Sequence, residues 1–145
     1  MTVTRDAFQA LVESARADHP LWFDLPTDET ADPESLDFIE QDLGATLPDD
    51  YRWFLSTFGG GDFAFARLYS GDRNSDLFLL ANQPKVRRDF VAVSDDGTGN
   101  LIGFPVLGGM CQERVMFLDH ETESLRPSEI IGFLEFVARS GLQEP

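Results

Sequence analysis

Apolar residues recur with a helical period near the start of the chain. In residues 4–18 they occupy positions i, i+3, i+4 and i+7 of one helix face, namely Phe8, Leu11, Val12 and Ala15. The pair His19-Pro20 follows, and proline cannot continue a helix. The pattern therefore predicts an amphipathic helix over 4–18.

A second helix is predicted over 33–43. Asp32 is placed as its N-cap, Pro33 at its first position and Gly44 as its C-terminal stop. A step of about 100° per residue gives this helix two faces. The core face carries Leu36, Ile39 and Leu43, and the residues that point away are Glu34, Asp37, Phe38 and Gln41.

A third helix is predicted from Pro48 to the glycine run 59–61. Asp49 and Asp50 lie in its first turn, where negative charge is favourable. Its apolar stripe consists of Tyr51, Phe54, Leu55 and Phe58. Trp53 lies on the other side of the helix.

After the glycine run the period changes to that of strands. Short apolar runs separated by turn formers predict antiparallel strands at 63–69, 77–81, 90–94, 101–104 and 114–119. A last helix is expected over 128–140, with its inward residues at Ile130, Phe133, Leu134 and Val137. The order of elements predicts a single α+β domain over 1–145. It should have an antiparallel sheet of about five to six strands flanked by N-terminal helices and a C-terminal helix.

The charge of the chain is strongly negative, with a formal net charge of −15. Phosphates would be repelled, so nucleic acid is not an expected partner. Between residues 17 and 51 there are eleven acidic residues and no Lys or Arg. This concentration has two interpretations: a face that only aids solubility, or a docking surface for a basic partner.

The cellular compartment follows from what the sequence lacks. Charged residues, among them Arg5, Asp6 and Glu13, stand where a signal peptide would be apolar, and no apolar run reaches the ~20 residues of a membrane span. The single cysteine, Cys111, cannot form an intramolecular disulfide. We expect a cytoplasmic protein that does not contact a membrane.

Common catalytic and cofactor motifs fail at identifiable positions. The segment beginning His120-Glu121 has Ser124 where a zinc protease needs its second histidine. The segment Gly97-Thr98-Gly99 has Ile102 in place of the third glycine of a dinucleotide fingerprint, and the only lysine, Lys85, follows a proline instead of a glycine. We therefore expect no enzyme activity, no cofactor and no metal. A metal-dependent enzyme using His120 is the alternative that metal analysis would test.

Several segments together resemble the SUKH superfamily. Residues 44–55, GATLPDDYRWFL, followed by Phe58 and the glycine run, are similar to that family's Leu-Gly, Leu-Pro-x-x-Tyr-Arg and Asn-Gly-Gly pattern. The Asp-Gly turn in 93–100, the strand ending in Asp-His-Glu at 115–121 and the C-terminal helix extend the resemblance over about 33–140. Phe58 and Asn100 depart from the usual residues, both at turns.

The resemblance implies a non-catalytic binding protein. For most bacterial members it implies an immunity protein that neutralises a toxin domain, often a nuclease; the alternative is a regulatory scaffold in cell-wall signalling. A nuclease is basic, so an acidic inhibitor gains association rate by electrostatic steering. The acids expected to supply the field are Asp24, Asp28, Glu29, Asp32, Glu34 and Asp37. We expect the free protein to be a monomer or a weak dimer.

Aromatic anchors should lie within the acidic rim, because charge alone contributes little net affinity. Phe38 and Trp53 are the candidates, since each points away from the core stripe of its own helix. The other possibility is that a second layer, such as residues 21–23, covers them.

Overall fold

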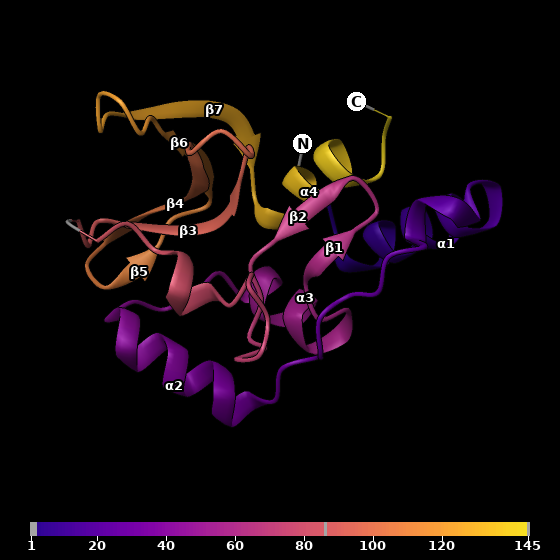
Figure 1. The fold of residues 1–145 in the computed structure, drawn as a ribbon, viewed down its shortest axis with the longest axis horizontal. Helices are drawn as coiled ribbons and strands as arrows, with labels where there is room; N and C mark the ends of the chain where they lie inside the picture. The colour runs from indigo at the N-terminus through magenta and orange to yellow at the C-terminus, as the bar shows by residue number, and fades with distance from the viewer. Residues whose placement is uncertain (1–2, 86, 145) are drawn as a thin grey trace.

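The computed structural model describes residues 3–85 and 87–144. Three α-helices precede the strands, and one follows them (Figure 1). The helices are α1 (Arg5–Asp18), α2 (Pro33–Leu43), α3 (Asp49–Thr57) and α4 (Phe133–Gly141), with short 3-10 helices η1 (Pro20–Phe23) and η2 (Leu79–Asn82). The strands are β1 (Gly61–Phe63), β2 (Ala66–Leu68), β3 (Phe90–Asp95), β4 (Leu101–Leu107), β5 (Met110–Cys111), β6 (Arg114–Leu118) and β7 (Leu125–Ile131).

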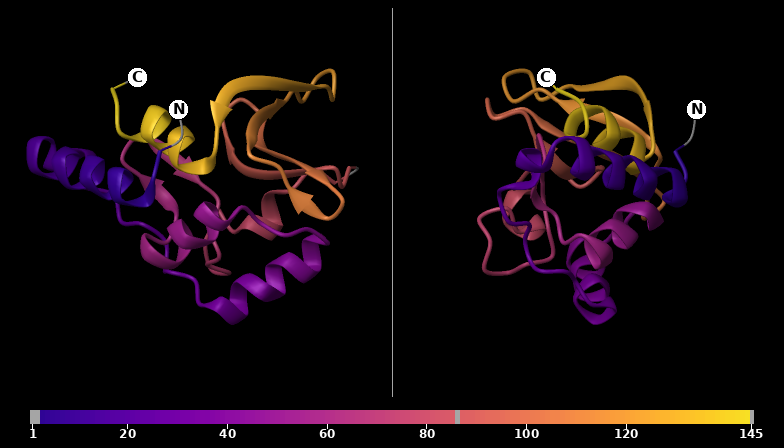
Figure 2. Two further views of the ribbon diagram at one scale, coloured as in Figure 1. Left: turned by 180° about the vertical axis from the view of Figure 1, so that it is seen from behind. Right: turned by 90° about the vertical axis from the view of Figure 1, so that its right-hand side faces the viewer.

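The strands form one antiparallel sheet in the order β1-β2-β3-β4-β6-β7, and β5 pairs with β4 outside this path. Helix α4 contacts β2 and β7 of the sheet and also packs against α1 and α3. The three views show α2 apart from this group, at the far side of the molecule from α4 (Figures 1 and 2). The predicted fold class, α+β with an antiparallel sheet flanked by N-terminal helices and a C-terminal helix, is confirmed.

The predicted ends of α2 are confirmed, because they depend on local signals. The Asp32 side chain accepts a 2.8 Å hydrogen bond from the backbone N–H of Ser35, and Gly44 is the C-cap of α2. At the start of α1 the Thr4 hydroxyl accepts from the N–H of Ala7. In each case a side chain or cap pairs a backbone group that the helix itself leaves unpaired.

Two of the predicted strands are wrong in detail. Residues 63–69 are divided between β1 and β2, which turn at Ala64, a residue with a φ of 51°. Only residues 79–81 of the run 77–81 lie in a regular element, and it is the 3-10 helix η2, because the Asn82 side chain donates to the carbonyls of Asp76 and Phe78 and closes a helical turn. A short apolar run fits a buried turn as well as a strand.

The last helix begins later than predicted. Residues 128–131 belong to strand β7, where Ile131 pairs with Arg114 of β6 and the Ser128 hydroxyl donates to the carbonyl of Val115. Gly132, with a φ of 94°, separates this strand from α4. The edge strand thus takes the first residues of the predicted helix, including Ile130.

The centre of the core is aromatic. Phe8 of α1 has ring contacts with Trp53, Phe54, Phe58 and Phe63, at centroid separations of 5.8–6.3 Å. Phe8 itself is fully buried. This cluster holds α1 against α3 and β1. Among the described residues, no helix has the length and apolarity needed to cross a membrane.

Candidate partner-binding surface

The acids predicted to bind a partner lie on the connection from η1 to α2 and on α2 itself. This connection runs along one side of the molecule and leads into α2 at its lower edge in Figure 1. Five of these residues are exposed: Asp24, Glu29, Asp32, Glu34 and Asp37. Most of the acidic residues that were predicted to attract a basic partner are therefore at the surface.

Asp28 is the exception, because its carboxylate holds the connection to the body of the protein. It accepts a 2.6 Å hydrogen bond from the hydroxyl of Ser70, and its backbone N–H donates to Gly60 at 3.0 Å. A side chain at Gly61 would lie 2.7 Å from the Asp28 carboxyl carbon. Asp28 thus has a structural role that the sequence did not reveal.

Asp32 combines its capping role with a stable negative charge. The hydrogen bonds that it accepts from Ser35 stabilise the charged form and lower the pKa of Asp32 below its usual value. The side chain remains exposed at the positive end of α2. It can contribute to a surface field while it caps the helix.

Arg52 of α3 joins the carboxylates of α2 to the rest of the domain. Its Nη1 lies 3.1 Å from Asp37 Oδ1 and 2.5 Å from Glu40 Oε1. The other Glu40 oxygen accepts from the backbone N–H of Leu47 at 2.8 Å. Glu40 is therefore internal support, whereas Asp37 is held in place and still has a side chain 67% exposed.

The two predicted aromatic anchors have different environments. Phe38 is 47% exposed, and the guanidinium of Arg73 lies 4.8 Å from its ring centroid. Trp53 is partly buried against the core, where it meets Phe8 edge to face, and Arg5 lies 5.4 Å from its ring. The cover of Trp53 is thus α1 and not the segment 21–23, and Phe38 is the more accessible of the two.

Sequence reasoning missed two exposed apolar residues. Leu107 and Met110 pair with each other at the tip of the β4–β5 hairpin and are 73% and 58% exposed. In the sequence they flank Gly108-Gly109, beyond the end of the strand predicted at 101–104. Their only local signal is the glycine pair, which indicates a tight turn.

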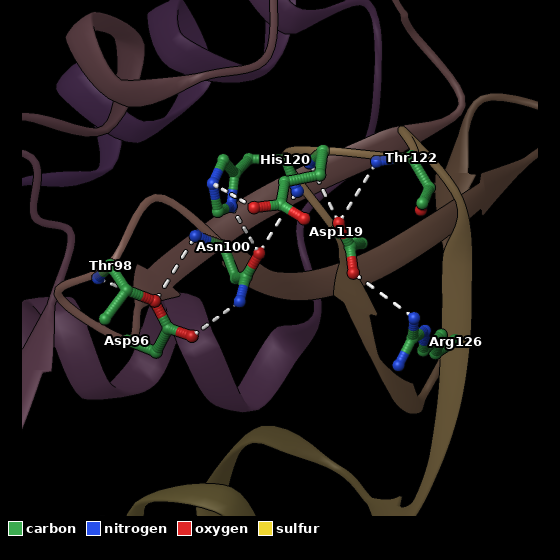
Figure 3. A network of polar contacts seen from close by, with 8 residues as sticks. Asp96, Thr98, Asn100, Asp119, His120, Thr122 and Arg126 are labelled. Carbon is green, nitrogen blue, oxygen red and sulfur yellow. Dashed lines mark hydrogen bonds and ion pairs between the residues drawn. The ribbon is translucent and has the colours of Figure 1, made fainter.

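A second polar cluster joins the turns after β3 and β6 (Figure 3). The Asn100 amide donates to Asp96 Oδ2 at 2.9 Å, so its carbonyl oxygen faces His120. That oxygen accepts from the His120 backbone N–H, and its 2.7 Å contact with Nδ1 assigns the ring proton to Nδ1. Hydrogen bonds from Thr98 and Asn100 lower the pKa of Asp96 to about 2.

The partners in this cluster are internal, which gives it a structural role. Asp119 accepts from the N–H groups of Glu121 and Thr122 and pairs with Arg126 at 3.2 Å.

Within the described ranges, no group of three or more His, Cys, Asp and Glu residues is arranged to hold a metal ion. Burial raises the pKa of the Cys111 thiol to about 12, so at neutral pH it is protonated and a poor nucleophile.

A comparison with known families identifies the chain. Residues 33–137 match the SUKH_6 family, described as SMI1-KNR4 cell-wall, and this match covers more than two thirds of the 145 residues. The chain belongs to the SUKH superfamily. A search of curated proteins found no match to the chain.

SUKH membership agrees with the motifs described above and extends over α2, α3, the sheet and part of α4. The fold of the superfamily is generally non-catalytic. Membership fits a role like that of an immunity protein, which acts by binding another protein. The partner of this SUKH protein must be inferred from its own surface.

Proposed function

We propose that this SUKH protein is a cytoplasmic immunity protein that binds and neutralises a cognate bacterial toxin. The partner is a basic nuclease-type toxin domain, and the mechanism is steric and electrostatic occlusion of its active site without catalysis. Family membership supports the class of function. The observation that carries the nature of the partner is the set of exposed carboxylates on residues 24–37, within a stretch that has no basic residue.

The charge distribution gives a physical reason for this pairing. A nuclease must present positive charge to bind phosphates, and an acidic surface of a binding protein is complementary to that charge. Long-range attraction raises the association rate, while desolvated contacts at the centre of an interface determine how slowly the complex dissociates. Asp24, Glu29 and Glu34 have exposed side chains without side-chain hydrogen bonds to the described residues, so they suit the first role.

Co-expression tests the proposal. The toxin domain encoded by the neighbouring gene should stop growth of a bacterial host, and co-expression of this SUKH protein should restore growth. The triple variant Asp24→Lys, Glu29→Lys, Glu34→Lys should protect less well. A control with the same change in charge is Glu13→Lys, Glu129→Lys, Glu144→Lys, at exposed positions outside the acidic stretch. Continued killing despite a stable complex would contradict the immunity role.

A further inference from the structure

We infer that the surface between the C-terminal end of α2 and the tip of the β4–β5 hairpin docks a basic, amphipathic segment of a protein partner. It takes a cationic side chain beside α2 and an apolar side chain on Leu107 and Met110. The inference deepens the proposed function by naming a surface and the chemistry of the segment that binds there. Its test does not depend on the toxin.

The apolar part of the surface is the hairpin tip. Leu107 and Met110 are cross-strand partners, joined by a two-residue turn at Gly108-Gly109 with φ values of 60° and 76°. Side chains opposite each other in an antiparallel pair lie next to one another, so the two form a continuous apolar contact. Both are among the large apolar side chains most exposed to solvent. A contiguous exposed apolar patch is typical of a site where another protein binds.

The hairpin is held firmly against the connection between α2 and α3. The backbone N–H of Thr46 donates to Gly109 at 2.8 Å, and the N–H of Cys111 donates to Thr46 at 2.9 Å. Figures 1 and 2 both place β5 next to the C-terminal end of α2. Since the tip is fixed before binding, a partner does not need to order it, and that lowers the cost of association.

The polar part is a hollow of about 440 Å³ between the hairpin and α2. Its walls include Asp37, Glu40, Gln41, Thr46 and Gly109. The last turn of α2 contains no basic residue, although the C-terminal end of a helix attracts positive charge. Helix dipole and carboxylates together favour a guanidinium or ammonium group in this hollow.

The contacts of Arg52 show that these carboxylates can bind such a group. Arg52, on α3, forms an ion pair with one carboxylate oxygen of Asp37 and one of Glu40. Oδ2 of Asp37 makes no hydrogen bond with any described residue, and this side chain is largely exposed. A partner's Arg or Lys can therefore add to the ion pair. A segment that alternates basic and apolar residues satisfies both parts of the surface, whereas nucleic acid would be repelled by the carboxylates.

A synthetic peptide of alternating Leu and Arg residues is the probe, and a peptide of the same charge with Ser in place of Leu is its control. Amide chemical shifts of the full chain should move most at residues 41–46 and 107–111 when the Leu-Arg peptide is added. The Ser-Arg peptide should bind at least about 10-fold more weakly, because it lacks the apolar contact.

Substitutions at the hairpin test whether the peptide binds at this surface. Leu107→Ser with Met110→Ser should weaken binding of the Leu-Arg peptide at least about 10-fold. Leu21→Ser with Leu25→Ser, at sites 77% and 62% exposed, should leave it unchanged. Shifts spread along residues 24–34, equal affinity of the two peptides, or no binding would each overturn the inference. The inference would also be overturned if the free protein formed a dimer that the hairpin substitutions dissociate, because a second copy of the chain would then occupy this surface. Loss of toxin neutralisation with intact peptide docking would refute the proposed function alone.

Discussion

The carboxylate of Asp28 accepts a hydrogen bond from the hydroxyl of Ser70, 42 residues further along the chain. Ser70 is fully buried, so this bond pairs a polar group that water cannot reach. It fastens the acidic connection to the segment that follows β2. The acidic surface therefore has a rigid attachment in its middle.

Asp28→Ala should lower the free energy of unfolding by about 1–3 kcal/mol, because it leaves the buried Ser70 hydroxyl without its acceptor. Glu29→Ala is the control. It removes the same charge at the next position, where the side chain is exposed. Urea denaturation would measure both, and equal stabilities would show that the Asp28–Ser70 bond contributes nothing.

Truncation of Trp53 should destabilise the fold more than truncation of Phe38. Trp53→Ala removes a ring that packs against Phe8 and Phe58, and it should destabilise the fold by about 3 kcal/mol. Phe38→Ala, at a half-exposed site beside Arg73, should cost less than about 1 kcal/mol. Thermal unfolding of the two variants would check the order. A larger loss for Phe38→Ala would mean that the two environments are assigned wrongly.

Acid should weaken the turns that meet at Asn100. The pKa of Asp96 in the folded protein, about 2, lies below its value in the unfolded chain. The unfolded chain therefore binds the proton more readily, and the stability that this group contributes is present above about pH 4 and lost toward pH 2. Asp32 and Asp119, whose pKa values are also lowered, act in the same direction.

Asp96→Asn should remove part of this pH dependence. Unfolding midpoints in urea, measured from pH 5 to pH 2, should fall less steeply for the variant than for the unchanged protein. Asp76→Asn, at an exposed site whose side chain makes no hydrogen bond with the described residues, is a suitable control. A slope unaltered by Asp96→Asn would contradict the assignment.

Glu135 is a buried carboxylate without full pairing. Its Oε2 is buried and has no hydrogen-bond partner among the residues that the structure describes, and Oε1 lies 3.9 Å from Arg139. Removing an incompletely paired buried charge relieves a desolvation cost. Glu135→Gln should raise the free energy of unfolding at neutral pH by about 1 kcal/mol. A loss of stability would show instead that the carboxylate is needed by α4.

The parts of the fold that were predicted correctly depend on neighbours in sequence. Asp32 and Gly44 define α2 because capping involves residues a few positions apart. The run 77–81 was misjudged because its conformation depends on Asn82 and Gln83, whose side chains bind carbonyls of the turn and of β3. Ser128 joins β7 for a similar reason, since its pairing partner lies on another strand.

The candidate surface was only partly visible in the sequence. The concentration of acids could be read directly, and most of them are exposed. Composition could not distinguish the structural carboxylates of Asp28 and Glu40 from free ones, because their partners are distant in sequence. Leu107 and Met110 were missed because they lie beyond the strand predicted at 101–104, and their exposure depends on how the hairpin packs against Thr46, which is distant in sequence.

The most direct test of the account is the association rate with the toxin domain encoded next to this gene, measured by stopped flow over a range of NaCl concentrations. The rate should fall steeply as the salt concentration increases, because salt screens the attraction between the two charged surfaces. At low salt, Asp24→Lys, Glu29→Lys, Glu34→Lys should lower the rate at least about 10-fold, and the Glu13, Glu129 and Glu144 control should lower it much less. An association rate independent of salt, or an equal loss in both triple variants, would contradict the claim that this acidic surface meets a basic partner.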